Sequence, residues 1–301
     1  MRIFMTGGKG FVGTRLTRAF CAQGHQVTVL TRSVKGTEDT LDGVSLLQGD
    51  PTQKGPWQEQ VEGHDVIVNL AGESVFKRWT RESKKRIRTS RLETTQNLVE
   101  ALPAESARMT LLSTSAVGYY GFRGDEALDE QSAPGDDFLA SVCRQWEAAA
   151  MGAQNKGTRV VICRFGIILG QGGGALQKMV SFFKKGLGSP LGSGKQWVSW
   201  IHEQDLADIY LLLLENPDLT GPINCTAPHP VTNKEMTRIL AEALKKPTAM
   251  PAVPAIVIRS LMGESSSLYL NGQKALPKRL TEAGFSFQFP KLKGALSHLE
   301  L

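Results

Sequence analysis

Short apolar runs alternate with longer amphipathic stretches over the first two-thirds of the chain. The apolar runs predict strands at 2–7, 26–32, 44–50, 65–72, 109–121 and 158–169. Apolar positions at helical spacing predict helices over 11–24, from beyond residue 72 to about 102, and over 138–152. Strands that alternate with helices are typical of βαβ units. The pattern therefore predicts an α/β fold with a doubly wound parallel sheet.

The last third follows another pattern. Glycine-rich loops flank a predicted helix over 175–186, and a helix at 203–216 precedes one more strand at 221–228. Two helical stretches around residues 247–254 and a compact helical tail over 276–299 follow. We expect residues 1–165, completed by 199–228, to form one domain. Residues 166–198 and 229–301 should form a smaller, mostly helical substrate lobe over the carboxyl ends of the strands, where ligands bind in such sheets.

A glycine motif, "MTGGKGFVG" at 5–13, joins the first strand to the first helix. Gly7, Gly10 and Gly13 permit a tight turn and a close approach of the backbone to a pyrophosphate at the helix N-terminus. The intervening residues of this candidate cofactor loop are Gly8, Lys9, Phe11 and Val12. Because strand and helix flank it in a βαβ unit, the motif predicts a Rossmann-type dinucleotide site.

The end of the second strand indicates which dinucleotide binds. An NAD site usually carries an acidic residue there for the ribose 2′-hydroxyl, but this strand ends with Thr31 and Arg32. Arg32 can pair with a 2′-phosphate, and Lys9 can assist. We therefore predict NADP(H); the alternative is that Arg32 is a solvated loop residue.

Arg91 falls on the apolar face of its predicted helix, together with Ile87, Leu98 and Leu102. A buried charge needs a partner. That partner is either an acidic side chain or a phosphate of the cofactor, and the sequence does not decide between them.

The net charge of +6 is concentrated in one segment. Residues 77–91 carry a local charge of +7, so the remainder sums to −1. The segment is either a solvated helix face or an anion-binding surface. We do not expect a nucleic-acid partner, because no aromatic residues interleave with the basic ones.

Four widely spaced cysteines and five histidines form neither a C-x-x-C nor an H-E-x-x-H pattern. We therefore expect reduced thiols, a cytoplasmic protein and no metal. The chain enters directly into a strand, so no signal peptide is predicted. Its apolar runs are too short for a membrane span.

Further motifs, "NLAG", "STSAVGYYG", "WIHEQDLA" and "GPINCTAP", complete a pattern that covers nearly the whole chain. The sequence resembles the extended short-chain dehydrogenases/reductases of the NAD-dependent epimerase/dehydratase family. "NLAGES", "RFGIILGQGGGAL" and the tail "NGQKALPKRLTEAGFSFQFP" are similar to an atypical branch known as epimerase family proteins, whose C-terminal domain has no known function. Family members are often dimers, so the resemblance leaves a homodimer open.

The resemblance adds residues to the expected cofactor site. It places Asp50 near the adenine, and Leu70, Ala71 and Gly72 along the middle of the dinucleotide. It suggests Arg91 and Arg164 as further contacts, although Arg164 can equally pair with an acidic side chain.

The family's catalytic pattern is incomplete in this chain. Ser115 matches the family's serine, but Leu139 and Cys143 stand where a tyrosine and a lysine normally transfer the proton. Tyr119, or the adjacent Tyr120, is a candidate substitute acid, and Glu73 can point toward the unknown small-molecule substrate. The prediction is an NADP(H)-dependent oxidoreductase or epimerase-like enzyme with a non-standard site; the alternative is a non-enzymatic redox sensor or assembly partner.

Overall fold

A seven-stranded parallel sheet forms the centre of the computed structural model, which describes residues 1–34, 41–247, 251–299 and 301. The strand order is β11-β7-β5-β4-β1-β2-β3, and every pairing is parallel. The strands are β1 (Arg2–Thr6), β2 (Gln26–Thr31), β3 (Val44–Gln48), β4 (Val66–Asn69), β5 (Thr110–Ala116), β7 (Arg159–Phe165) and β11 (Gly221–Cys225). The predicted doubly wound sheet is confirmed.

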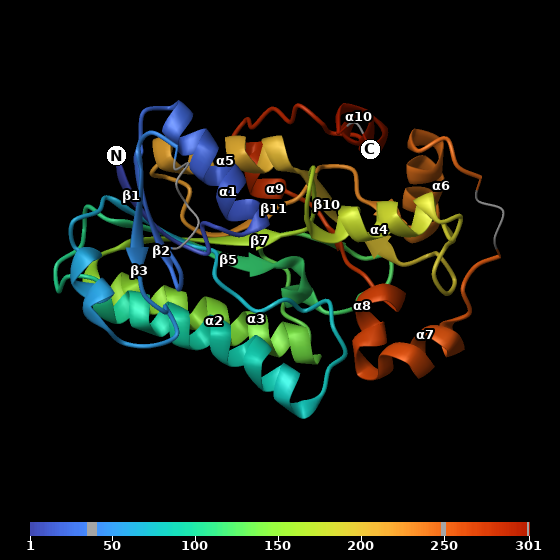
Figure 1. Ribbon diagram of the computed structural model, residues 1–301, viewed down its shortest axis with the longest axis horizontal. Helices are drawn as coiled ribbons and strands as arrows, with labels where there is room; N and C mark the ends of the chain where they lie inside the picture. Colours follow the sequence, from blue (N-terminus) through green and yellow to red (C-terminus); the bar gives the residue numbers. More distant parts are fainter. Residues whose placement is uncertain (35–40, 248–250, 300) are drawn as a thin grey trace.

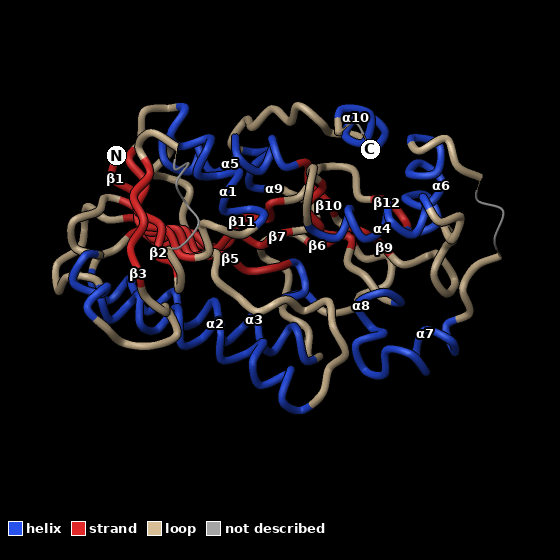
Figure 2. Tube along the Cα trace, viewed as in Figure 1, coloured by secondary structure: helices blue, strands red, loops and turns tan. Residues whose placement is uncertain are grey.

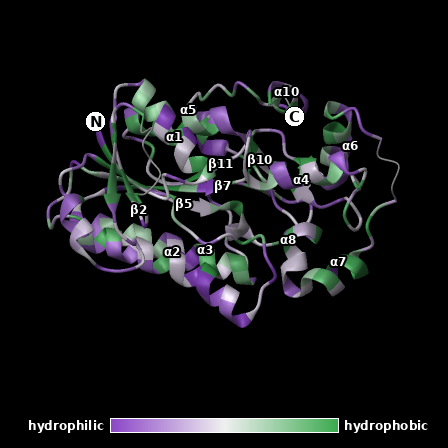
Figure 3. Ribbon diagram, viewed as in Figure 1, coloured by the Kyte–Doolittle hydropathy of each residue, from purple (hydrophilic) through white to green (hydrophobic). Residues whose placement is uncertain are grey.

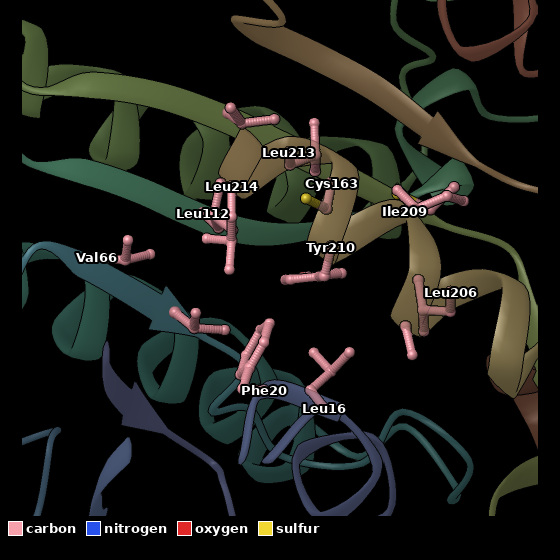
Figure 4. Close-up of a cluster of buried hydrophobic side chains, with 14 of the residues drawn as sticks. Leu16, Phe20, Val66, Leu112, Cys163, Leu206, Ile209, Tyr210, Leu213 and Leu214 are labelled. Atoms are coloured by element: carbon pink, nitrogen blue, oxygen red, sulfur yellow. The ribbon is translucent and has the colours of Figure 1, made fainter. Parts of the chain in front are cut away.

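Helices cover both faces of the sheet (Figure 1). Helices α1 (Phe11–Ala22) and α5 (Glu203–Glu215) lie on one face, and α2 (Arg81–Ala101) and α3 (Phe138–Met151) on the other. Successive side chains of a strand point to opposite faces. Thus Ile3 and Met5 join one core cluster, whereas Phe4 joins the other. Figure 4 shows Leu16 and Phe20 of α1 in the first cluster, opposite residues of α5.

The predicted strands at 109–121 and 158–169 end furthest before their predicted limits. The strand predicted at 158–169 divides at Gly166, where a Cβ atom would lie 2.8 Å from the Ser199 carbonyl oxygen. The backbone then leaves the main sheet and continues as β8 (Ile167–Leu169), which pairs with β10 (Trp200–His202). The fifth strand stops at Ala116 and passes into the 3₁₀ turn η2 (Val117–Tyr120).

A second group of elements lies beyond the carboxyl ends of the strands (Figure 2). Its helices are α4 (Gly174–Lys184), α6 (Asn233–Ala243), α7 (Ala255–Met262), α8 (Ser267–Leu270) and α10 (Leu292–His298). Its small sheets pair β9 (Trp197–Val198) with β12 (Val231–Thr232), and β13 (Lys274–Ala275) with β6 (Ala127–Leu128). Helix α9 (Lys278–Glu282) instead lies beside β11, and its Leu280 joins the core cluster under α1 and α5. The remaining short helices are η1 (Pro56–Gln60), η3 (Gly152–Lys156) and η4 (Gly263–Ser266). Part of the proline-containing stretch at 247–254 falls outside the described residues.

The basic segment 77–91 begins before α2 and continues along it, and Figure 3 shows hydrophilic colouring over much of this helix. Lys77 pairs with Glu73, Arg86 pairs with Glu82, and Lys84 reaches Glu264 at 2.7 Å in the second group. Several of these cations therefore have acidic partners. No helix in the described part of the chain is long and apolar enough to cross a membrane.

Candidate functional site: the glycine turn and the strand ends beside it

The glycine motif forms a tight turn from β1 into α1. Gly7 has a φ of +72°, and a Cβ there would lie 2.9 Å from the Ala71 nitrogen. A Cβ on Gly13 would lie 2.5 Å from the Gly8 Cα atom. Helix α1 has neither a side-chain cap nor an acidic residue in its first turn. Its first backbone N–H groups are therefore available to an anion.

Lys9, Thr31 and Arg32 lie at or beyond the carboxyl ends of β1 and β2. The Lys9 ammonium donates to the Ser33 carbonyl oxygen at 3.2 Å, and the Thr31 hydroxyl accepts from the Ser33 amide at 3.3 Å. Arg32 is exposed. The pairing of β1 with β2 thus brings two cations to the edge of the glycine turn.

Asp50 follows β3 at the same end of the sheet. One of its carboxylate oxygens accepts from the Thr52 amide at 2.9 Å and from the Thr52 hydroxyl at 2.8 Å. These bonds fix a turn of the kind that aspartate commonly forms. The other carboxylate oxygen has no described bond to another residue, so it is available to a ligand.

Arg91 lies against the segment that follows β4. Its Nη1 donates to the carbonyl oxygens of Glu73 and Ile87, both at 2.9 Å, and its guanidinium lies 5.1 Å from the Trp146 ring. Burial lowers its pKa. Among the described residues, no carboxylate lies within ion-pair distance of Arg91. Arg91 therefore has no acidic partner in the described part of the chain. Its Nε and Nη2 atoms remain available to a phosphate of the cofactor.

Leu70, Ala71 and Gly72 run between the glycine turn and Arg91. The Ala71 amide donates to the Thr6 hydroxyl at 3.4 Å. A Cβ on Gly72 would lie 3.1 Å from the Arg91 Cζ atom, so only glycine fits without moving the guanidinium. These residues form a continuous wall with the turn.

A buried polar network, which the sequence reasoning missed, supports this wall. Asn69 accepts from the Thr6 hydroxyl at 2.8 Å, and donates to the hydroxyls of Thr95 at 2.8 Å and Ser113 at 3.3 Å. Thr95 also accepts from the Trp146 indole at 2.9 Å. The network ties the ends of β1 and β4 and the middle of β5 to α2 and α3. In the sequence, this network could be recognised by the polar residues Thr6, Asn69 and Ser113, each of which stands within an apolar run.

Ser115 is buried beside a second network. Its hydroxyl donates to Glu147 at 2.6 Å, and Glu147 binds Arg164 through two hydrogen bonds of 2.9 and 2.7 Å. Of the two roles expected for Arg164, cofactor contact or ion pair, the structure shows the ion pair, with Glu147. The sequence did not indicate a role for Glu147, because no motif marks its position on α3 as a functional site. Glu147 shares a helix face with Leu139 and Cys143, at spacings of four residues.

The two tyrosines of η2 lie on the other side of Arg164. The Arg164 guanidinium stacks over the Tyr119 ring at 3.6 Å and donates to the Tyr120 hydroxyl at 3.0 Å. Tyr120 is fully buried and donates to Asn224 at 2.7 Å, and burial raises its pKa to about 12. It is therefore a poor proton donor at neutral pH. Tyr119 is half-buried and remains the more accessible phenol.

Leu139 and Cys143 lie on the side of α3 that packs against η2 and the end of β5. The Leu139 side chain lies near Gly118, and Cys143 is buried. Burial, with the nearby Glu147 charge, raises the Cys143 pKa to about 11. The thiol is thus neutral at physiological pH and provides no positive charge for proton transfer.

Glu73 is half-exposed at the mouth of the site. Its carboxylate pairs with Lys77 and lies 3.9 Å from Arg86. The hydrogen bond from Lys77 lowers its pKa. The side chain is therefore an ionised hydrogen-bond acceptor at neutral pH.

His202 has a structural role at the start of α5. Its Nδ1 accepts from the Gln204 amide at 3.0 Å, and its Nε2 lies 3.3 Å from His298. Asp205, in the first turn of α5, accepts from the amides of Gln288 and Phe289 at 2.7 and 3.1 Å and so links the helix to the C-terminal tail.

Comparison with known proteins agrees with this geometry. Residues 3–225 match the model of the NAD dependent epimerase/dehydratase family, and residues 253–299 match a domain of unknown function, DUF1731. The chain is 42% identical over 299 residues to the chloroplastic epimerase family protein SDR39U1 homolog of Arabidopsis thaliana, covering 98% of this chain and 86% of that protein. It is 38% identical to epimerase family protein YfhF of Bacillus subtilis, covering 99% and 98%.

Solved structures show the same similarity. The human epimerase family protein SDR39U1, crystallised with NADPH, superposes with a TM-score of 0.86 at 35% identity, covering 100% of this chain and 99% of that one. The UDP-glucose 4-epimerase of Thermus thermophilus, at 21% identity and a TM-score of 0.77, shows the shared fold. This chain belongs to the NAD dependent epimerase/dehydratase family.

Proposed function

We propose that the protein binds NADP(H) across the carboxyl ends of β1, β2 and β4. The observation that carries the proposal is the glycine turn, in which backbone atoms of the turn and its neighbours leave no space for side chains at Gly7 and Gly13. Such a turn suits a pyrophosphate at the N-terminus of α1. The related human protein was crystallised with NADPH, which supports the choice of dinucleotide.

In this proposal, Gly7, Gly8, Gly10, Phe11, Val12 and Gly13 hold the pyrophosphate, and Lys9, Thr31 and Arg32 hold the 2′-phosphoribose. Asp50 contacts the adenosine portion. Leu70, Ala71 and Gly72 line the middle of the dinucleotide, where Arg91 offers its remaining donors. Arg164 is left out, because two of its nitrogens bind Glu147.

For the chemistry, we propose a non-standard oxidoreductase or epimerase-like site that acts on a small molecule. NADPH supplies a hydride when it is bound. Ser115 donates its proton to Glu147, and Tyr120 is buried. Tyr119 is therefore the phenol best placed to donate a proton, and Glu73 can accept a hydrogen bond from substrate. We also propose that residues 1–165 and 199–228 form the cofactor domain, and that residues 166–198 and 229–301 form the substrate lobe.

A non-enzymatic redox sensor is the second candidate, favoured by the neutral Leu139 and Cys143 in place of the usual acid and its cation. A panel of carbonyl compounds and sugar nucleotides, tested for NADPH consumption, separates the two candidates: turnover abolished by Tyr119→Phe supports the enzyme, and no turnover supports the sensor. The four free thiols also support a reducing, cytoplasm-like compartment.

Titration of the chain with NADPH and NADH tests the binding proposal. We expect NADPH to bind at least tenfold more tightly, because Arg32 can pair with the additional phosphate. Arg32→Ala should remove most of that difference while leaving NADH affinity nearly unchanged. Arg238→Ala, at an exposed position of α6, is the matched control. Equal affinities for the two dinucleotides would contradict the proposal.

A further inference from the structure

The glycine-rich loop 170–174 lies directly against the glycine motif. Three of its glycines surround the Phe11 ring. A Cβ on Gly170 would lie 2.8 Å from the Phe11 Cζ atom, one on Gly173 would lie 2.8 Å from Cγ, and one on Gly174 would lie 3.1 Å from Cε1. Gly172, in contrast, faces open space. The glycines of this loop therefore form a slot for an aromatic ring that belongs to the first turn of α1.

Polar contacts hold the loop in this position. Arg15, one turn after Phe11 on α1, donates to the Gln171 carbonyl oxygen at 3.0 Å and pairs with Glu203 at 2.9 Å. Glu203 also accepts from the Gln171 amide at 3.3 Å. Helix α1, the loop and the start of α5 are thus joined around one carboxylate.

The C-terminal end of the chain reaches the same loop. The Gln171 side-chain amide donates to the Leu299 carbonyl oxygen at 2.8 Å. The segment before α10 is itself anchored by the two backbone bonds to Asp205. A path of direct contacts therefore leads from the C-terminal helix, through the loop, to the first turn of α1.

We propose that loop 170–174 is a positioning element of the dinucleotide site. It holds the Phe11 ring, and so fixes the backbone N–H groups at the start of α1 that would face the pyrophosphate. Because the C-terminal end of the chain holds the loop, this end helps to set cofactor affinity without touching the cofactor. This inference rests on the NADP(H) binding proposed above.

Gly173→Ala is the most direct test. Gly173 has an extended backbone, with φ of −168°, so alanine adds no backbone strain, and the three atoms nearest to its methyl group all belong to the Phe11 side chain. The matched control is Gly294→Ala, because Gly294 is exposed on α10 with nothing within 4 Å of its Cβ position. We expect Gly173→Ala to raise the Kd for NADPH at least tenfold and Gly294→Ala to leave it within twofold.

A second substitution separates positioning from general damage. Phe11→Leu in the Gly173→Ala background gives the methyl group room, so the double variant should bind NADPH more tightly than Gly173→Ala alone. Failure of this rescue, or an unchanged Kd for Gly173→Ala in a protein that binds NADPH, would overturn the inference and leave the binding proposal intact. No binding by the unaltered chain would overturn both.

If Gly173→Ala does not fold, Arg15→Ala provides the same readout. It removes the contacts from α1 to Gln171 and Glu203 at a partly exposed position. A Kd raised at least threefold supports the inference, and an unchanged Kd overturns it.

Discussion

At the scale of single residues, Glu147 occupies the position on α3 that decides what its neighbours can do. It accepts the proton of Ser115 and balances the charge of Arg164, whose side chain is only 3% exposed. Ser115 thus turns its proton away from any ligand. The family's tyrosine and lysine are thus replaced by Leu139 and Cys143, and Ser115, which matches the family, binds Glu147 instead of a ligand.

Glu147→Gln should destabilise the fold strongly. The change leaves the Arg164 charge buried without a counter-ion, which costs about 3–5 kcal/mol in comparable pairs. Glu242→Gln, in the exposed pair with Arg238, should cost less than about 0.5 kcal/mol. Urea unfolding measures both free energies. Similar losses for the two variants would refute the assigned importance of the buried pair.

The sequence could predict the tight turn of the glycine motif because its residues are contiguous. At Gly7 and Gly13 the backbone packs too closely for a side chain. The sequence could not predict that Glu147 meets Arg164, because the contact joins a helix to a strand that follows it. Arg91 shows the intermediate case: helical spacing placed it on an apolar face, but only the fold reveals that its described partners are carbonyl oxygens.

At the scale of elements, helix α5 depends on His202 at its N-terminus. The neutral ring accepts from the Gln204 amide, stacks on Phe289 at 3.9 Å and contacts His298 of α10. Burial, together with the nearby His298, lowers the His202 pKa to about 4. Protonation of this ring would therefore weaken the start of α5 and its contact with α10.

Stability should fall as the pH falls from about 6.5 to about 4. In that range the unfolded chain binds a proton at His202 that the folded chain excludes, so folding is favoured above pH 6.5 and loses about 3 kcal/mol toward pH 4. His202→Asn keeps a capping oxygen but does not titrate. Denaturant unfolding at several pH values should show a shallower pH dependence for this variant. The same slope in both proteins would refute the role of His202.

The strand and helix periods predicted the seven main strands and α1 to α5, because each element buries an apolar face of its own. They did not predict the break at Gly166. There the backbone leaves the main sheet where it meets Ser199, which comes from a distant part of the chain. Tertiary contacts of this kind carry no local period.

At the scale of the whole molecule, contacts from the second group of elements reach both sides of the proposed cofactor site. Lys84 of α2 pairs with Glu264, and loop 170–174 encloses Phe11 of α1. Lys84 belongs to the basic segment 77–91, so part of that segment serves to bind the second group of elements. Cofactor binding and the arrangement of the C-terminal region should therefore depend on each other.

A structure of the protein with NADPH tests the central claim most directly. We expect the pyrophosphate over Gly7–Gly13, the 2′-phosphate within hydrogen-bonding distance of Arg32, and Leu139 and Cys143 where the family's tyrosine and lysine would face the nicotinamide. A dinucleotide bound elsewhere, or a 2′-phosphate remote from Arg32 and Lys9, would contradict the central claim.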